Sequence, residues 1–290
     1  MNIGIIGIGL IGSSLALAFR EKVPDAHILI ADINEDHIAI AKSRDLGHHY
    51  DTNPAYLAKT ADIIFICTPV SAIARVAKEI SEYLKPEAII TDVGSVKSQI
   101  INAVRKDIPE RTVFIPGHPI AGTENSGPAA GFAELFQNKS YILTPLDTTD
   151  EHHLETIENL LRRIGAVPSR MDADEHDRIM GFASHIVHIF AFSGMLESER
   201  INNTLKHDVF DYAKGSFQDF TRVAASDVTM WRDIFMNNSE HVVKIARDVV
   251  KQADAFIQAI EQRDENRLVD MITKARALKL AQLEKDKTKT

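Results

Sequence analysis

Residues 2–12 read NIGIIGIGLIG and decide the fold class of this chain. The stretch opens with a short apolar run suited to a buried strand, and a GxGxxG pattern follows at once. In a dinucleotide-binding βαβ unit, the first glycine allows a tight turn, the second admits a pyrophosphate, and the third lets the helix pack on the strand. The helix start then offers free amides and a positive dipole end to the phosphates. The residues of this predicted cofactor turn are Gly7, Gly9, Leu10, Ile11 and Gly12.

A second cofactor signal is Asp32, at the end of the apolar run 27–32. A carboxylate at the end of the second strand accepts hydrogen bonds from the ribose hydroxyls and repels a 2′-phosphate, so it favours NAD over NADP. The alternative is a strand and helix joined by an incidental run of glycines, with Asp32 simply solvated.

From residue 2 to residue 171, short β-rich apolar runs alternate with amphipathic helical stretches, which is typical of a doubly wound parallel sheet. The expected strands cover residues 2–7, 27–32, 62–67, 88–92, 112–115, 140–144 and 167–171. The expected helices cover residues 10–20, 34–46, 70–84, 96–105 and 150–164.

The remaining sequence is predicted to be all helix. All 10 prolines lie at or before Pro168, so the segment after it has few helix breakers. We expect helices over residues 173–201, 208–225, 227–236, 239–263 and 264–285. The run 186–192 is apolar almost all round, as in a helix buried within a domain or a subunit interface. The sequence thus predicts a Rossmann-type α/β domain over residues 1–170 and an all-α domain over residues 171–290.

Composition narrows the function classes. The chain has 290 residues, 44% of them hydrophobic, and no uninterrupted apolar run long enough to span a membrane. A formal net charge of −8 argues against a nucleic-acid partner. The chain begins directly with strand-like sequence and carries one cysteine, Cys67, so we expect no signal peptide, no intrachain disulfide and a cytoplasmic location.

Three further segments follow expected strands, where ligands bind open α/β sheets. Thr68 and Pro69 come after the strand that ends at Cys67 and are candidate contacts to the cofactor, although Cys67 itself is equally typical of a buried structural cysteine. The segments 92–97 (DVGSVK) and 116–124 (PGHPIAGTE) emerge at the same edge. His118, between glycine and proline in an expected loop, is suited to accept a hydroxyl proton as hydride leaves the same carbon, and Ser95 could orient it.

The helical half adds further polar candidates. His185 and His188 are three residues apart on an apolar helix. A metal site is not expected, because no set of carboxylates or cysteines with ligand spacing accompanies them. We expect the two histidines to face a substrate pocket or to bond to each other. The planar fork of Arg222 suits a substrate carboxylate, with an ion pair to Asp219 or Asp227 as the alternative.

Taken together, the glycine turn, 92–97, 117–124 (GHPIAGTE), 184–188 (SHIVH) and 217–222 (FQDFTR) resemble the prephenate dehydrogenase family over nearly the whole chain. The resemblance implies NAD-dependent oxidative decarboxylation of prephenate to 4-hydroxyphenylpyruvate in tyrosine biosynthesis, by a homodimer assembled through its helical domain. It implies that His118 assists deprotonation of the substrate hydroxyl with support from Ser95, which also lies at the cofactor. The resemblance also implies that Arg222 binds a substrate carboxylate. A histidine of the SHIVH motif lines the substrate pocket in this family; His188 is the better match and His185 the alternative. Matches to other pocket positions are Thr123, Glu124 and Trp231.

Three other functions stay open from the sequence. Arogenate dehydrogenase differs in recognising an ammonium on the substrate side chain, for which Glu124 or Asp219 could serve. A β-hydroxyacid or imine-type dehydrogenase shares the layout but typically has a lysine or aspartate where this chain has His185 and His188. A non-catalytic NAD-binding protein is the third, and the presence of His118 and Arg222 argues against it.

Overall fold

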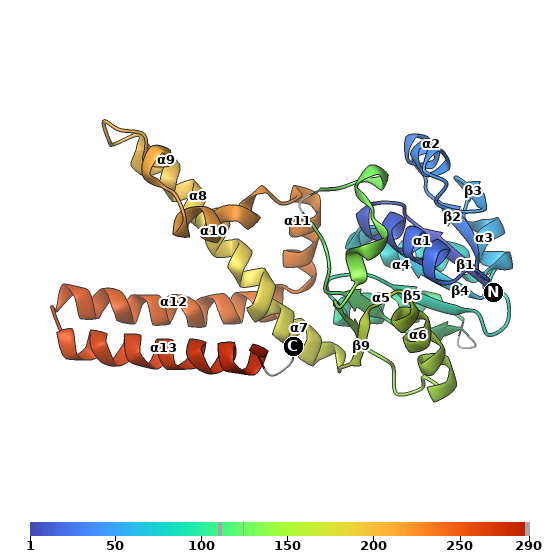
Figure 1. Ribbon diagram of the computed structural model, residues 1–290. Helices are drawn as coiled ribbons and strands as arrows, with labels where there is room; N and C mark the ends of the chain where they lie inside the picture. The colour runs from blue at the N-terminus through green and yellow to red at the C-terminus, as the bar shows by residue number, and fades with distance from the viewer. Residues whose placement is uncertain (110–111, 124, 288–290) are drawn as a thin grey trace. The chain divides into compact units, whose positions relative to one another are not determined.

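The computed structural model describes residues 1–109, 112–123 and 125–287 and divides the chain into two compact units, Met1–Ser239 and Glu240–Thr290 (Figure 1). The first unit contains a six-stranded sheet in the order β3-β2-β1-β4-β5-β6, and every neighbouring pair is parallel. Its strands are β1 (Asn2–Ile6), β2 (His27–Ala31), β3 (His49–Asp51), β4 (Ile63–Ile66), β5 (Ile89–Asp92) and β6 (Val113–Phe114). The predicted Rossmann-type fold is confirmed, since this strand order is that of the doubly wound dinucleotide-binding sheet.

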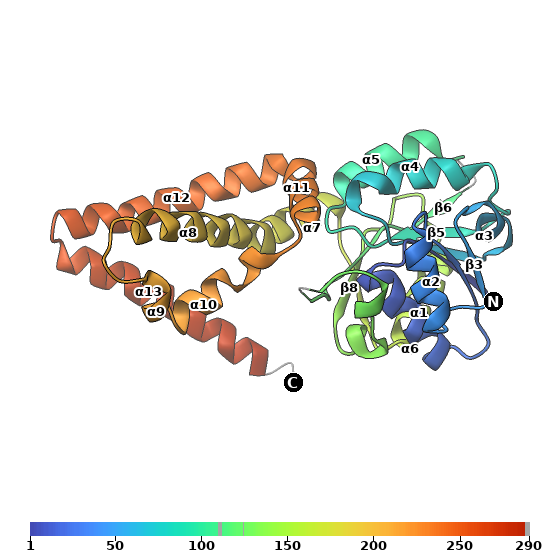
Figure 2. The same ribbon diagram turned by 90° about the horizontal axis from the view of Figure 1, so that it is seen from above.

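Helices cover both faces of this sheet, so its central strands are buried on both sides (Figure 2). One face packs on α1 (Leu10–Lys22), α2 (Glu35–Ser43) and α6 (Glu151–Arg163). The other face packs on α3 (Ala55–Thr60), α4 (Val70–Ser81) and α5 (Ser98–Asp107). The short elements β3 and α3 were not predicted, because neither is long enough to show a hydrophobic period.

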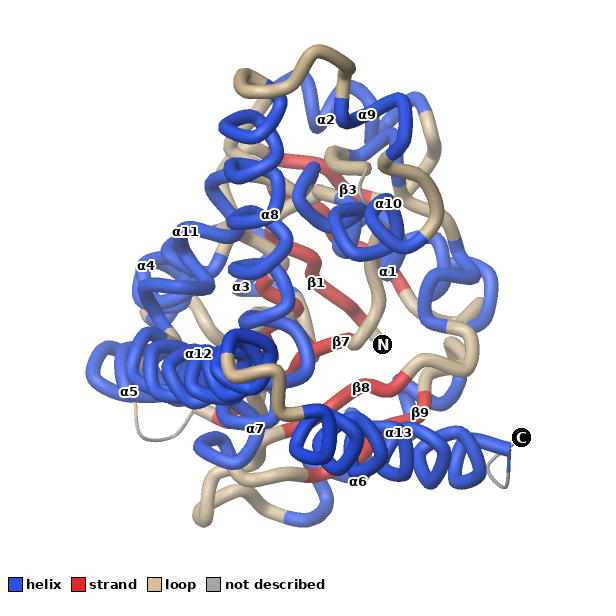
Figure 3. Tube along the Cα trace, turned by 90° about the vertical axis from the view of Figure 1, so that its left-hand side faces the viewer, coloured by secondary structure: helices blue, strands red, loops and turns tan. Residues whose placement is uncertain are grey.

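A second sheet of three strands contains His118 (Figure 3). It consists of β7 (Gly117–Pro119), β8 (Ser140–Leu143) and β9 (Val167–Arg170), with β7 antiparallel to β8 and β8 parallel to β9. The expectation that His118 lies in a loop is therefore wrong: it lies in β7 opposite Ile142, although glycine and proline flank it. Two short 3₁₀ segments, η1 (Pro128–Ala130) and η2 (Ala133–Phe136), lie between β7 and β8.

Beyond β9 the described chain is helical, as predicted. The elements of the first unit are α7 (Ala173–Met180), a π-helical segment η3 (Gly181–His185), α8 (Ile186–Asn202), α9 (Val209–Tyr212), α10 (Ser216–Thr221), a 3₁₀ segment η4 (Arg222–Ala225) and α11 (Val228–Asn237). The single helix predicted over 208–225 is wrong. The chain breaks between α9 and α10, where Gly215 takes a φ of +54° that helix geometry does not allow.

The run 186–192 is only partly buried within the chain, with Val187 exposed and Phe190 half-buried. The sequence predicted that this run is buried either within a domain or in a subunit interface. Burial within the domain is therefore wrong for this run. The continuous helical stretch Ala173–Asn202 is also long and apolar enough to cross a membrane by length and composition, a test that core and interface helices pass as well.

The second unit consists of two long helices. They are α12 (Ser239–Glu261), which begins at the last residue of the first unit, and α13 (Glu265–Lys287). Both expose apolar side chains, including Val250 and Ile257 on α12 and Ile272 and Leu278 on α13.

Candidate active site

The turn between β1 and α1 has the geometry that a dinucleotide requires. Gly7 has a φ of +92°, and a Cβ on Gly12 would lie 2.1 Å from the carbonyl oxygen of Gly7, so neither position accepts a side chain. A Cβ on Gly9 would meet no atom within 4 Å, which leaves the approach to this turn open. The first turn of α1, with Leu10 and Ile11, carries no acidic residue and no side-chain cap, so its amides are available to a phosphate.

Asp32 lies beside this turn at the end of β2. Its Oδ2 accepts a hydrogen bond of 2.8 Å from the amide of Ile8, its Oδ1 accepts from the amide of Asn34, and His37 Nδ1 lies 3.3 Å from Oδ2. At the end of β4, the Thr68 hydroxyl is buried without a hydrogen-bond partner among the described residues, and Pro69 leads into α4. An open glycine turn, a carboxylate and an unpartnered hydroxyl at one sheet edge fit a dinucleotide.

A buried ion pair links β5 to β7. The Lys97 ammonium donates to Asp92 Oδ2 and, over 2.7 Å, to the carbonyl oxygen of Gly117, and both charged side chains are fully buried. Asp92 also accepts from the amides of Gly94 and Gly117. Burial lowers the pKa of Lys97, and the carboxylate of Asp92 partly offsets this effect. The pair therefore fastens the segment after β5 to the residue that precedes His118.

His118 is held by partners that the sequence analysis missed. Its Nδ1 lies 2.8 Å from Nε2 of His176 on α7, and His176 Nδ1 lies 2.9 Å from Oδ1 of Asp177. We call Asp177, His176 and His118 the histidine row. The expected hydrogen bond between Ser95 and His118 is absent from the described part of the chain, where His176 is the partner of His118 Nδ1; Ser95 itself is half-buried.

Burial and hydrogen bonds shift the pKa values of His118 and Asp177. Burial lowers the pKa of His118 well below the usual range of histidine, and the neighbouring His176 lowers it further. Burial alone would raise the pKa of Asp177, but hydrogen bonds from His176 and from the amides of Ser98 and Lys97 lower it overall. His118 is therefore a neutral base above pH 6.5, opposite an ionised carboxylate at the far end of the row.

The histidines of the helical half lie around Trp231 on α11. The His188 ring stacks on the indole at 3.4 Å between centroids, and its Nδ1 lies 3.0 Å from the Ser184 carbonyl oxygen. His185 meets the same indole edge-on and is buried, with Asn238 Nδ2 3.1 Å from its Nδ1. His188 is half-buried, so it is the better placed of the two to meet a ligand.

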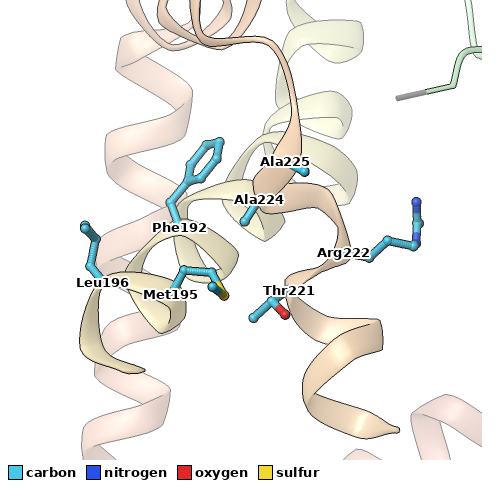
Figure 4. Close-up of a pocket in the computed structure, with 7 residues that line it drawn as sticks. All are labelled: Phe192, Met195, Leu196, Thr221, Arg222, Ala224 and Ala225. Carbon is cyan, nitrogen blue, oxygen red and sulfur yellow. The ribbon is translucent and has the colours of Figure 1, made fainter. Parts of the chain in front are cut away.

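Arg222 begins η4 and lies at an apolar cavity of about 690 Å³ (Figure 4). Its guanidinium extends away from Phe192 and Met195 on α8, and its charge contributes to lowering the pKa of His188. Among the described residues, no ion pair joins Arg222 to Asp219 or Asp227; Asp227 instead caps α11 through the amide of Met230. The salt-bridge alternative for Arg222 is therefore wrong for these two partners.

The two remaining candidates, Thr123 and Glu124, follow β7 in the sequence. Thr123 is exposed, and its hydroxyl accepts a hydrogen bond from the amide of Asn125. Glu124 lies outside the described residues. Within the described ranges, no group of three or more His, Cys, Asp or Glu side chains is arranged to hold a metal ion.

The burial of His185 has a consequence for stability. Burial lowers its pKa from 6.5 to about 4, so protonation favours the unfolded chain. The resulting stabilisation, about 3 kcal/mol, is fully present above pH 6.5 and is lost as the pH falls toward 4. Urea unfolding of the wild type and of His185→Gln between pH 7 and pH 4 should show a shallower pH dependence for the variant. Equal slopes would contradict this assignment.

Comparison with known proteins matches two family models to consecutive parts of the chain. The nucleotide-binding domain model of prephenate dehydrogenase matches residues 15–169, and the dimerization domain model matches residues 172–274. This chain belongs to the prephenate dehydrogenase family. A cyclohexadienyl dehydrogenase of Zymomonas mobilis is 34% identical over 97% of this chain and 95% of its own length.

Two solved structures of the family are similar over their whole length. The prephenate dehydrogenase of A. aeolicus, in complex with hydroxyphenyl propionate and NAD⁺, has a TM-score of 0.89 and 32% identity, covering 97% of both chains. The arogenate dehydrogenase of Synechocystis has a TM-score of 0.81 and 26% identity, covering 96% of this chain and 99% of its own.

Proposed function

We propose that this member of the prephenate dehydrogenase family catalyses the NAD-dependent oxidative decarboxylation of prephenate to 4-hydroxyphenylpyruvate, the dehydrogenase step of tyrosine biosynthesis. The observation that carries the proposal is His118, a half-buried imidazole of lowered pKa that is fixed through Nδ1 in strand β7. A base in this state can accept a proton from a hydroxyl at neutral pH.

The roles of the chain's own residues follow from this geometry. His118 Nε2 accepts the proton of the substrate hydroxyl, while the glycine turn of Gly7, Gly9 and Gly12 and the carboxylate of Asp32 hold NAD. When bound, NAD supplies the hydride acceptor for the same carbon. Loss of the ring carboxylate as carbon dioxide makes the ring aromatic, so the step needs a base and correct positioning but little acid catalysis.

The remaining contacts concern substrate binding. Arg222 binds a substrate carboxylate, and His188 lines the pocket against Trp231, whose buried indole N–H has no partner among the described residues. Thr123 and Glu124, which follow β7 in the sequence, contribute further substrate contacts. His185 contributes through its edge-on contact with Trp231. Ser95, Leu10, Ile11, Thr68 and Pro69 complete the cofactor contacts.

Organisation and location are proposed as follows. Residues 1–170 bind the cofactor, and residues 171–290 bind substrate and form a homodimer. The partly exposed apolar faces of α8, together with the dimerization domain matched over residues 172–274, support such an assembly. We propose a cytoplasmic enzyme without a nucleic-acid or membrane partner, in keeping with the net charge of −8 and the lone cysteine.

The test is reduction of NAD or NADP, followed by absorbance at 340 nm, with prephenate or arogenate as the substrate in four parallel assays. Turnover of NAD with prephenate is the expected result. A clear preference for arogenate would keep the mechanism and change the substrate; the similarity to the Synechocystis arogenate dehydrogenase is the observation behind this alternative. Tight NAD binding without turnover of either substrate would contradict the proposal and indicate a different dehydrogenase or a non-catalytic binder.

Replacing Arg222 with glutamine should raise the KM for prephenate about 10- to 100-fold, because a charge-assisted hydrogen bond to a carboxylate contributes roughly 1.5–3 kcal/mol. We expect kcat to change less than KM. Arg200→Gln is the matched control, since Arg200 is an exposed arginine of α8 paired with Glu197. Steady-state kinetics measure both constants; a fall in kcat at constant KM would assign Arg222 to another role.

A further inference from the structure

The histidine row has a proton arrangement that its hydrogen bonds determine. Both oxygens of Asp177 accept backbone hydrogen bonds, Oδ1 from the amide of Lys97 at 2.8 Å and Oδ2 from the amide of Ser98 at 2.9 Å. Two amide donors stabilise the ionised form of a carboxyl group. Asp177 therefore acts only as an acceptor, and the hydrogen on its bond to His176 belongs to the imidazole.

The position of that hydrogen fixes the next one. His176 carries its hydrogen on Nδ1, which faces Asp177 Oδ1 at 2.9 Å. In its neutral form, His176 has one N–H and one acceptor nitrogen, so with the hydrogen on Nδ1 its Nε2 accepts. The 2.8 Å bond between His176 Nε2 and His118 Nδ1 then requires a hydrogen on His118 Nδ1. His118 Nε2 is left with its lone pair free.

We propose that His176 and Asp177 are positioning residues that hold His118 in the tautomer able to act as a base through Nε2. This inference rests on the proposed function, in which His118 accepts the proton of the substrate hydroxyl. When that proton leaves the hydroxyl oxygen and binds the Nε2 lone pair, His118 carries a hydrogen on both nitrogens and a positive charge. The row needs no other proton transfer, because His118 Nδ1 still donates to His176 and Asp177 remains ionised.

Residues from more than one element hold the histidine row in place, as a positioning role requires. Besides the amides of Lys97 and Ser98, Asn238 Nδ2 donates over 2.8 Å to the backbone oxygen of Asp177. His176 is fully buried and Asp177 nearly so. The start of α5 thus fixes the carboxylate of Asp177, and the residue after α11 fixes its backbone. A base held by locked neighbours keeps its geometry through the reaction.

The simpler interpretation is that Asp177 serves only to bind the amides before α5, and that His176 merely fills space beside His118. These interpretations differ in one measurable property. A purely structural role leaves the tautomer of His118 undetermined, whereas the proposed role fixes it as Nδ1–H.

The experiment uses ¹⁵N-histidine-labelled protein with NAD bound and long-range ¹H–¹⁵N correlation spectra, which distinguish the two neutral tautomers and the doubly protonated ring. We expect Nδ1–H on both His118 and His176 in the wild type, assigned by loss of each signal in His118→Asn and His176→Gln. A hydrogen on Nε2 of either ring, or a doubly protonated His176, would overturn the proposal. This readout needs no substrate, so its outcome is independent of whether prephenate is turned over.

Two variants of His176 extend the test to catalysis. Glutamine retains an acceptor for His118 Nδ1 and should keep the Nδ1–H tautomer, with kcat lowered about threefold. Leucine removes the acceptor, so the tautomer should no longer be fixed, and kcat should fall on the order of 100-fold while KM and the Kd for NAD stay within about twofold. Glu175→Gln, an exposed neighbour on α7, is the control. Equal kcat values for the glutamine and leucine variants would overturn the positioning role.

Discussion

Replacement of His118 with asparagine should lower kcat with prephenate about 10²- to 10⁴-fold, the range over which a positioned base contributes to catalysis. Asparagine is the informative substitution, because its amide can still donate to His176 in place of Nδ1 but offers no base at the position of Nε2. The effect therefore isolates the proton-accepting nitrogen from the packing of the site.

NAD binding should change little in this variant, since the glycine turn and Asp32 are untouched. Isothermal titration with NAD measures this directly, and His152→Asn, at an exposed histidine of α6, is the matched control. In the wild type, the low pKa of His118 should keep kcat/KM high below pH 6.5 and confine the acid loss to lower pH. Turnover by the asparagine variant within a few-fold of the wild type would remove His118 from the reaction.

Replacement of Lys97 with methionine should lower the free energy of unfolding by about 3–5 kcal/mol, as expected when one partner of a buried ion pair is removed. Methionine keeps most of the side-chain volume, so the loss reflects the Asp92 carboxylate left buried with only the amides of Gly94 and Gly117. Denaturant unfolding monitored by circular dichroism gives the value.

The chain supplies its own control for this second prediction. Lys78 pairs with Asp107 at 3.1 Å, but both side chains are exposed, so Lys78→Met should cost less than about 1 kcal/mol. The double variant Lys97→Met with Asp92→Asn should recover part of the loss, because it removes the unpaired charge. Equal stability of the Lys97 and Lys78 variants would show that the buried pair contributes nothing.

The parts of the molecule that depend on local sequence were predictable. The glycine turn and Asp32 belong to one βαβ unit, so their spacing along the chain predicts their meeting in space. The absence of proline beyond Pro168 predicted a helical half, and the helices over 173–201 and 227–236 correspond to elements of the structure. Gly215 is the exception, because its positive φ breaks the single helix predicted over 208–225.

The histidine row could not be predicted in the same way. His176 and Asp177 lie in the charged segment 172–178 (DADEHDR), which is typical of a solvated helix start. Tertiary packing brings His176 to His118, which lies on another element. Lys97 was visible as part of a motif, but nothing local indicates that a lysine is fully buried. One signal was available: a buried strand ending in an aspartate, followed closely by a lysine.

The stacking of His188 on Trp231 gives this protein an intrinsic optical probe. The chain has one tryptophan, which is buried, so its emission reports a single environment in the helical half of the site. A ligand that moves the His188 ring or reaches the indole N–H changes the polarity and contacts of that one fluorophore. Binding of a ligand at this part of the site can thus be followed without labels.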